Sequence, residues 1–231
     1  MAVRTVLVLV VNVMRIYFYK RENSMNRKML KALKNKYIYV DIDGTIAEYR
    51  FNNHVSAKDG TTNGQTMKEI ENHVFLHSRP LKTVIQTLKR AKKHGIWICG
   101  AIISPIELED KAVWLKANCK GIEFNGCFWF VPDEYWKSFL KYFNCSTNNY
   151  DIVTEHGIII KGSKTQIWDW LINHKVYETD KKHSLKDVVF IDYVLTYLKY
   201  AEERGVTAYH ISSFIDYEVN IDNLNINLQK K

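Results

Sequence analysis

The stretch Tyr37-Ile-Tyr-Val-Asp-Ile-Asp-Gly-Thr45 joins a short apolar run to two acids, a glycine and a threonine. Its first part, residues 37–42, is rich in β-branched and aromatic residues, which predicts a buried strand. Gly44 then allows the chain to turn sharply away after the acids. Side chains two residues apart on an extended chain face the same way, so we expect Asp41 and Asp43 to point together at the end of this strand.

Strand patterns alternate with helical patterns along the rest of the chain. Further strands are expected at 96–103, 122–131, 158–160, 188–191 and 206–211, and helices at 81–93, 106–117, 133–143, 165–174 and 195–204. This alternation predicts an α/β fold, a three-layer α/β/α, Rossmann-like arrangement with a mostly parallel sheet covered on both faces.

The composition is that of an ordinary folded protein. The chain has 231 residues, of which 46% are hydrophobic and 25% charged, and this argues against a disordered or fibrous protein. Lys and Arg total 33 against 25 for Asp and Glu, a formal charge of +8 that attracts phosphate-bearing partners or simply reflects a solvated surface. The lysines are dispersed and no Arg-rich stripe is present, so nucleic acid is not favoured as a partner. The four cysteines show no paired spacing, which indicates reduced thiols and a cytoplasmic protein.

The chain divides into a core and several additional segments. Residues 1–36 are interpreted as an N-terminal extension without a catalytic role, residues 37–218 as the core, and 219–231 as a tail. An apolar run near the start is too short for a transmembrane span, although it leaves peripheral membrane association open. Polar residues at about 46–79 predict a small insertion. An aromatic-rich second insertion is expected at about 125–157, and its aromatic residues are interpreted as ordinary core residues in preference to a second lid.

The candidate site residues follow the predicted strands, because ligands of parallel sheets bind at the carboxyl ends of strands. Asp41 and Asp43 follow the first strand, Ser104 follows the second, and Asp192 follows a later one. Lys164 precedes the helix that leads into that later strand. Three carboxylates, a hydroxyl and a lysine are therefore expected at one edge of the sheet.

Residues 37–45 resemble the first motif of the haloacid dehalogenase-like (HAD) superfamily, a hydrophobic strand followed by DxDGT. Arg79-Pro80-Leu81, Ile103-Ser104-Pro105 and Lys111-Ala-Val-Trp114-Leu115 resemble the 5′-nucleotidase-like branch, and the similarity spans about 37–212. The resemblance implies an HAD-like core with a small cap over the site. It also implies a Mg²⁺-dependent phosphohydrolase that acts on a small phosphomonoester, such as a nucleotide, through an aspartyl-phosphate.

The implied chemistry explains the acids. A carboxylate nucleophile divides the slow hydrolysis of a phosphomonoester into two steps, and by resemblance this nucleophile is Asp41. Asp43 would protonate the leaving oxygen and then deprotonate water. Carboxylates and phosphate repel one another, so a cation is required, and Mg²⁺ suits oxygen ligands. The resemblance implies that the Asp41 side chain, the Asp43 backbone carbonyl and the Asp192 side chain hold it.

By the same resemblance, Ser104 and Lys164 bind the phosphate. Ser104 also suits the N-cap of the following helix, and it can fill both roles. Lys164 is favoured because its helix leads directly to the Asp192 strand, while Lys137 stays an alternative. In the cap, Tyr49, Phe51, Asn52 and His54 are candidates for contacts with the substrate.

Two other functions stay open. The family often has a second acid after the metal-binding one, but this chain has Tyr193 there. That departure raises the alternative of a non-catalytic phosphate-binding or interaction module with the same fold. The net charge alone supports a second alternative, a phosphatase of nucleic-acid ends.

Overall fold

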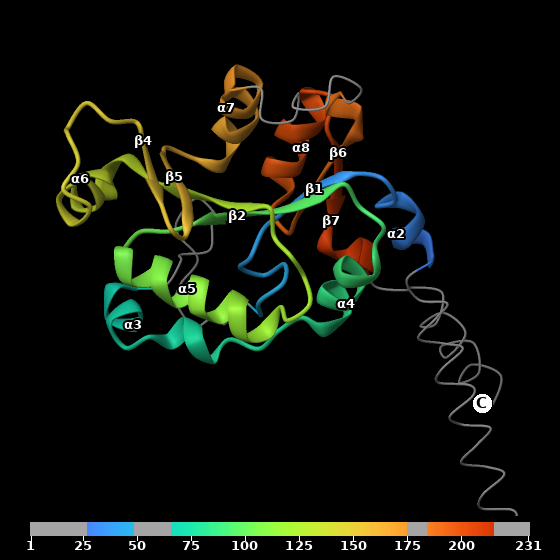
Figure 1. Ribbon diagram of the computed structural model, residues 1–231, viewed down its shortest axis with the longest axis horizontal. Coiled ribbons are helices and arrows are strands. Elements are labelled where there is room, and N and C mark those ends of the chain that lie inside the picture. The colour runs from blue at the N-terminus through green and yellow to red at the C-terminus, as the bar shows by residue number, and fades with distance from the viewer. Residues whose placement is uncertain (1–26, 49–65, 175–183, 215–231) are drawn as a thin grey trace, which may run out of the picture.

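A seven-stranded sheet organises the residues that the computed structural model describes, which are 27–48, 66–174 and 184–214 (Figure 1). Its strands are β1 (Tyr37–Val40), β2 (Gly95–Ala101), β3 (Gly126–Val131), β4 (Asp151–Thr154), β5 (Gly157–Lys161), β6 (Val188–Asp192) and β7 (Thr207–His210). Their spatial order is β4-β5-β3-β2-β1-β6-β7. Every neighbouring pair is parallel except β4 and β5, which form an antiparallel pair at one edge.

Strand β1 lies at the point where the chain changes direction across the sheet. After β1 the chain adds β2, β3 and β5 on one side, and it then returns to the other side of β1 with β6 and β7. Tyr37 of β1 is in register with Gly95 of β2 and with Val188 of β6. The carboxyl ends of β1 and β6 flank this topological switch point, where open α/β sheets bind their ligands.

Helices cover both faces of the sheet. The α-helices are α2 (Arg27–Ala32), α3 (Met67–Glu71), α4 (Lys82–Arg90), α5 (Pro105–Asn118), α6 (Asp133–Tyr142), α7 (Ile167–His174) and α8 (Leu195–Glu203). The short 3₁₀ turns are η1 (Val74–His77), η2 (Lys164–Gln166), η3 (Leu185–Asp187) and η4 (Ile211–Phe214). Figure 1 shows α3, α4 and α5 on one side of the sheet and α7 and α8 on the other.

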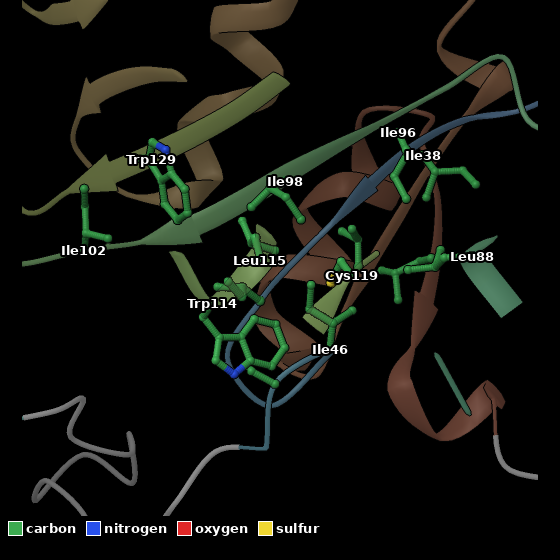
Figure 2. Close-up of a cluster of buried hydrophobic side chains, with 14 of the residues drawn as sticks. Ile38, Ile46, Leu88, Ile96, Ile98, Ile102, Trp114, Leu115, Cys119 and Trp129 are labelled. Atoms are coloured by element: carbon green, nitrogen blue, oxygen red, sulfur yellow. The ribbon is translucent and has the colours of Figure 1, made fainter. Parts of the chain in front are cut away.

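Alternating strand residues form two separate hydrophobic clusters, one on each face. In β1, Ile38 and Val40 belong to the cluster under α4 and α5, whereas Tyr39 belongs to the cluster under α7 and α8. Figure 2 shows part of the first cluster, which contains Ile38 and Ile98 of the sheet together with Trp114 and Leu115 of α5. The sequence-based expectation of a three-layer α/β/α, Rossmann-like, mostly parallel arrangement is confirmed.

Helix α5 fixes the segment that precedes α4. Ser104 caps the helix and Pro105 opens it, a pairing that satisfies a free backbone N–H at its start. The buried Trp114 ring meets Phe75 of η1 edge to face, and its Nε1–H donates a hydrogen bond to the Ser78 carbonyl at 2.8 Å. The described end of the expected cap segment is thus packed against α5.

Two expected segments differ in the structure. Residues 125–157 include β3, which lies between β2 and β5, so the first part of the expected second insertion belongs to the main sheet. The three aromatic residues of β3 are core residues, because Phe128 and Phe130 pack on one face of the sheet and Trp129 on the other. Residues 27–36 are likewise more than an extension, since Met29 and Leu33 are buried in the core.

Other expectations fall partly or wholly outside the described residues. The cap candidates Tyr49, Phe51, Asn52 and His54 lie there, as does the apolar run near the N-terminus. Within the described ranges, no helix is long and apolar enough to cross a membrane.

Candidate active site

The turn after β1 holds the first acid at the edge of the sheet. The backbone N–H of Asp41 donates to the Ile191 carbonyl at 2.9 Å, which continues the pairing of β1 with β6. Gly44 adopts a φ of +70°, and its N–H donates to the Ala47 carbonyl at 2.8 Å. Ile42 is buried and anchors the turn in the core. A side chain at position 44 would be strained, so glycine is required by this backbone conformation.

Asp41, Asp192 and Lys164 form a buried ionic group, which we call the Lys164 cluster. The Lys164 ammonium contacts Oδ1 of Asp41 and lies 3.3 Å from Oδ2 of Asp192. The Thr45 hydroxyl donates to Oδ2 of Asp41 at 3.1 Å. Both acids are 0% exposed and Lys164 is 6% exposed, so these charges are shielded from water.

Three separate segments bring the Lys164 cluster together. Asp41 follows β1, and Asp192 ends the neighbouring strand β6. Oδ1 of Asp192 also accepts a hydrogen bond from the Val194 N–H at 2.8 Å, which orients that carboxylate. Lys164 begins η2 directly after the turn that follows β5, with Gly162 at a φ of +116°. This arrangement agrees with the sequence-based prediction that strand order brings Lys164 to the two acids.

With both of its acids ionised, the Lys164 cluster would carry an excess negative charge. Two carboxylates against one ammonium would leave a net charge of −1 in a buried place, where unbalanced charge is costly. Burial, followed by the neighbouring Asp192 carboxylate, raises the pKa of Asp41 to about 8 even though Lys164 opposes the shift. Burial would lower the pKa of Lys164, but the two carboxylates outweigh it and raise that pKa above its ordinary value. A further cation bound beside these acids would favour the ionised form of Asp41.

Asp43 belongs to a second ionic group, the Lys111 cluster, which consists of Asp43, Glu107 and Lys111. The Lys111 ammonium lies 2.7 Å from Oδ2 of Asp43 and 2.8 Å from Oε1 of Glu107. It also donates to the Ala101 carbonyl at 2.6 Å. Asp43 is partly exposed, with 19% of its side chain accessible, whereas the Lys111 side chain is only 1% accessible.

Sequence reasoning did not assign a role to Lys111 or Glu107. Burial would lower the pKa of Lys111, but the carboxylates of Asp43 and Glu107 raise it above the ordinary lysine value. Burial raises the pKa of Glu107 despite its contact with Lys111. A signal was present in the sequence, because these two charged residues are four apart and share a helix face with Leu108 and Trp114.

The remaining predicted residues are placed as follows. The Ser104 hydroxyl accepts a hydrogen bond from the Ile106 N–H at 3.2 Å, so it is the helix cap that the sequence indicated as one of its roles. Ser104 is buried in the loop after β2, at the same sheet edge as Asp41. Lys137 is exposed on α6, and Lys164 is the lysine that contacts Asp41.

Tyr193 occupies the position where the resembled family often has a second acid. Its ring packs against the turn after β1, because a Cβ placed on Gly44 would lie 2.9 Å from the Tyr193 ring. Its backbone carbonyl accepts a hydrogen bond from Nε2 of His210 at 3.0 Å. The residue therefore supports the backbone of the site with its ring instead of adding a third carboxylate beside Asp192.

The donor set fits a hard divalent cation with few protein ligands. No three acidic, histidine or cysteine side chains of the described ranges are grouped closely enough to hold a metal ion by themselves. Asp41 and Asp192 nevertheless supply two buried carboxyl groups at the ends of neighbouring strands, and only one ammonium lies between them. Mg²⁺ is commonly held by one or two carboxylates together with water and substrate phosphate.

A cavity of about 580 Å³ lies elsewhere in the fold. It is bordered by the C-terminal half of α5, the start of β3 and the turn between β4 and β5. Gly126 and Gly157 begin the parallel strands β3 and β5, so this cavity lies at the amino ends of the strands, whereas Asp41 lies at the carboxyl end of β1. It is not part of the candidate active site.

A scan against protein-family models finds none that matches this chain, and a search of curated proteins finds no match. The interpretation of the site therefore depends on the geometry of its own residues and on the sequence motif.

Proposed function

We propose that this chain is an HAD-like, Mg²⁺-dependent phosphohydrolase that acts on small phosphomonoesters. The main observation is the Lys164 cluster, in which Asp41 and Asp192 lie buried around one ammonium at the switch point of the sheet. Buried ionic groups of this kind occur preferentially at functional sites. The DxDGT motif at residues 41–45 supports the assignment of phosphoryl transfer.

In the proposed reaction, a carboxylate oxygen of Asp41 attacks phosphorus, and the bond from phosphorus to the ester oxygen breaks. Asp43 gives its proton to the departing alkoxide, which leaves as an alcohol. Water then attacks the aspartyl-phosphate and gives a proton to Asp43. This second step releases inorganic phosphate and restores the Asp41 carboxylate.

The cations of the site would stabilise the negative charge that builds up on the phosphoryl group. Lys164 would hold Asp41 in place and offset the negative charge of the phosphate. The Asp41 and Asp192 side chains and the Asp43 backbone carbonyl would hold Mg²⁺. When bound, Mg²⁺ supplies positive charge that reduces the repulsion between the carboxylates and the substrate. Ser104 is available at the same edge to donate to a phosphoryl oxygen.

The test is phosphate release by the full chain from a panel of phosphomonoesters with MgCl₂. The panel should include p-nitrophenyl phosphate, sugar phosphates, nucleoside 5′-monophosphates and a 5′-phosphorylated oligonucleotide. We expect turnover of at least one small substrate, and Asp41→Asn should abolish it. Lys137→Met is the matched control, because Lys137 is exposed on α6, and it should retain wild-type activity.

The outcomes separate the proposal from its alternatives. Phosphate release from the oligonucleotide alone would favour a phosphatase of nucleic-acid ends. Binding of phosphate without hydrolysis of any substrate would favour a non-catalytic module. Turnover that persists in Asp41→Asn would remove Asp41 as the nucleophile.

A further inference from the structure

The geometry points to Lys111 and Glu107 as positioning residues that hold the Asp43 side chain in a fixed place relative to the loop that carries Ser104. This inference rests on the proposed function, because it assigns Asp43 the proton transfers of that reaction. It concerns two side chains of α5 that lie outside the DxDGT motif and for which the sequence predicted no chemical role. Neither Lys111 nor Glu107 would touch the reacting atoms.

The contacts form a continuous connection between two loops. Oδ2 of Asp43, in the loop after β1, lies 2.7 Å from the Lys111 ammonium. Lys111 in turn lies 2.8 Å from Oε1 of Glu107. The other oxygen of Glu107 accepts the Ile103 N–H at 2.8 Å, and Ile103 directly precedes Ser104. The carboxylate of Asp43 is thereby connected to the backbone that carries Ser104.

The contacts of the Lys111 ammonium use all of its hydrogen-bond donors. It has three donor hydrogens, and three oxygens lie within 2.8 Å of it, from Asp43, Glu107 and the Ala101 carbonyl. Its side chain is 1% exposed, so it is not available to bind a phosphate directly. A buried ammonium whose partners are all fixed restricts the rotamers of those partners, and here one partner is the proposed acid and base.

Positioning has a specific kinetic consequence. Proton donation by Asp43 matters most when the leaving group is a poor one, such as an alkoxide. A nitrophenolate leaves readily without it. Loss of the Lys111 contact should therefore reduce the hydrolysis of alkyl phosphates much more than that of p-nitrophenyl phosphate. A general loss of structure would reduce both reactions equally.

The experiment compares kcat/KM for glycerol phosphate and p-nitrophenyl phosphate in the full chain with MgCl₂. In Lys111→Met we expect about a 100-fold loss for glycerol phosphate and less than about a 5-fold loss for p-nitrophenyl phosphate. Glu107→Gln, which keeps an acceptor for the Ile103 N–H, should show a weaker loss of the same pattern. Lys116→Met is the matched control, since Lys116 is exposed on the same helix. It should change neither value.

Two further comparisons keep this inference separable from the proposed function. Adding Lys111→Met to Asp43→Asn should cause little further loss of kcat/KM, because the residue that Lys111 positions is already absent. Equal losses for both substrates in Lys111→Met and Glu107→Gln, or fully additive losses in the double variant, would overturn the positioning role while leaving the phosphohydrolase intact. If wild type hydrolyses no phosphomonoester, the proposed function fails and the positioning role fails with it.

Thermal unfolding provides a measurement that does not depend on activity. The Asp43→Asn and Lys111→Met double variant should have a Tm close to that of Lys111→Met alone, because the contact has already been lost. Independent, additive Tm losses would show that Asp43 and Lys111 do not interact, and they would overturn the inference even in an inactive protein.

Discussion

The Lys164 cluster and the Lys111 cluster contain the same groups, one ammonium between two carboxylates, but they differ in construction. The Lys164 cluster joins three segments that are distant in sequence, and both of its acids are fully buried. In the Lys111 cluster, lysine and glutamate are four residues apart on one helix, and the partner acid is partly exposed. In the first cluster both acids share one ammonium away from water, whereas in the second Asp43 is partly exposed, and the Ala101 carbonyl and the Ile103 N–H add backbone contacts.

The difference indicates that the two clusters have different roles, one in binding and one in positioning. A site that binds a cation and a phosphate needs charge that the fold itself leaves uncompensated. A site that only positions a side chain needs every donor and acceptor satisfied. The two clusters should therefore respond differently to matched changes, and four predictions test this difference.

The largest expected difference is in activity towards p-nitrophenyl phosphate. Lys164→Met should lower kcat by about 100- to 1,000-fold, because it removes a fixed positive charge from beside the proposed nucleophile. Lys111→Met should lower it far less with this substrate. Steady-state kinetics with circular dichroism as a check on folding would measure both, and similar losses in the two variants would contradict the comparison.

Binding of Mg²⁺ should be specific to the Lys164 cluster. At 100 times its dissociation constant, a ligand of the folded state adds about 2.7 kcal/mol to the free energy of unfolding. MgCl₂ should stabilise wild type and Glu107→Gln in this way, whereas Asp192→Asn should lose most of the effect. Denaturant titrations with NaCl of matched ionic strength provide the control. Equal stabilisation of Asp192→Asn would place the cation elsewhere.

Replacing Tyr193 by an acid should strengthen that cation site. Tyr193→Asp would add a carboxylate next to Asp192, and we expect about a tenfold lower MgCl₂ concentration for half-maximal activity, equivalent to about 1.4 kcal/mol. Tyr193→Phe keeps the ring that packs near Gly44, and it should leave the MgCl₂ dependence unchanged. An unchanged requirement in Tyr193→Asp would show that this position does not reach the cation.

The smallest expected effect concerns stability without a metal. With EDTA present at neutral pH, Asp41→Asn should raise the free energy of unfolding by about 1 kcal/mol, because it removes an acid whose ionisation is opposed by burial and keeps an acceptor for Lys164. Asp43→Asn should lower it by up to about 1 kcal/mol, because a partly exposed acid loses its attraction to Lys111. Urea denaturation measures both variants. A loss in Asp41→Asn as large as that in Asp43→Asn would show that the two clusters are alike.

Much of the fold was predictable because its signals are local. The apolar run before Asp41 predicted β1, and the Ser104-Pro105 pair predicted the start of α5. The antiparallel strand β4 was not predicted, because it is four residues long and buries only one large apolar residue, Ile152, while Val153 is 80% exposed. Such a strand depends on its partner β5 more than on its own pattern.

The candidate site was predictable where strand order alone brings residues together. Asp41, Asp192 and Lys164 follow from the rule that ligands bind at the carboxyl ends of parallel strands. The contact of Lys111 with Asp43 could not be inferred in this way. It depends on which face of α5 packs against the sheet and on the rotation of that helix, and both are properties of the whole core.

The hydrogen bond from the Asp41 N–H to the Ile191 carbonyl makes the proposed nucleophile part of the backbone pairing between β1 and β6, neither of which is an edge strand. The acid cannot become exposed through the movement of a surface loop, because its amide is released only when the centre of the sheet opens. Its amide proton should therefore exchange with solvent as slowly as those of the core strands. Proteolytic cleavage in peripheral segments would then leave the chemistry of this edge assembled until the domain unfolds as a whole.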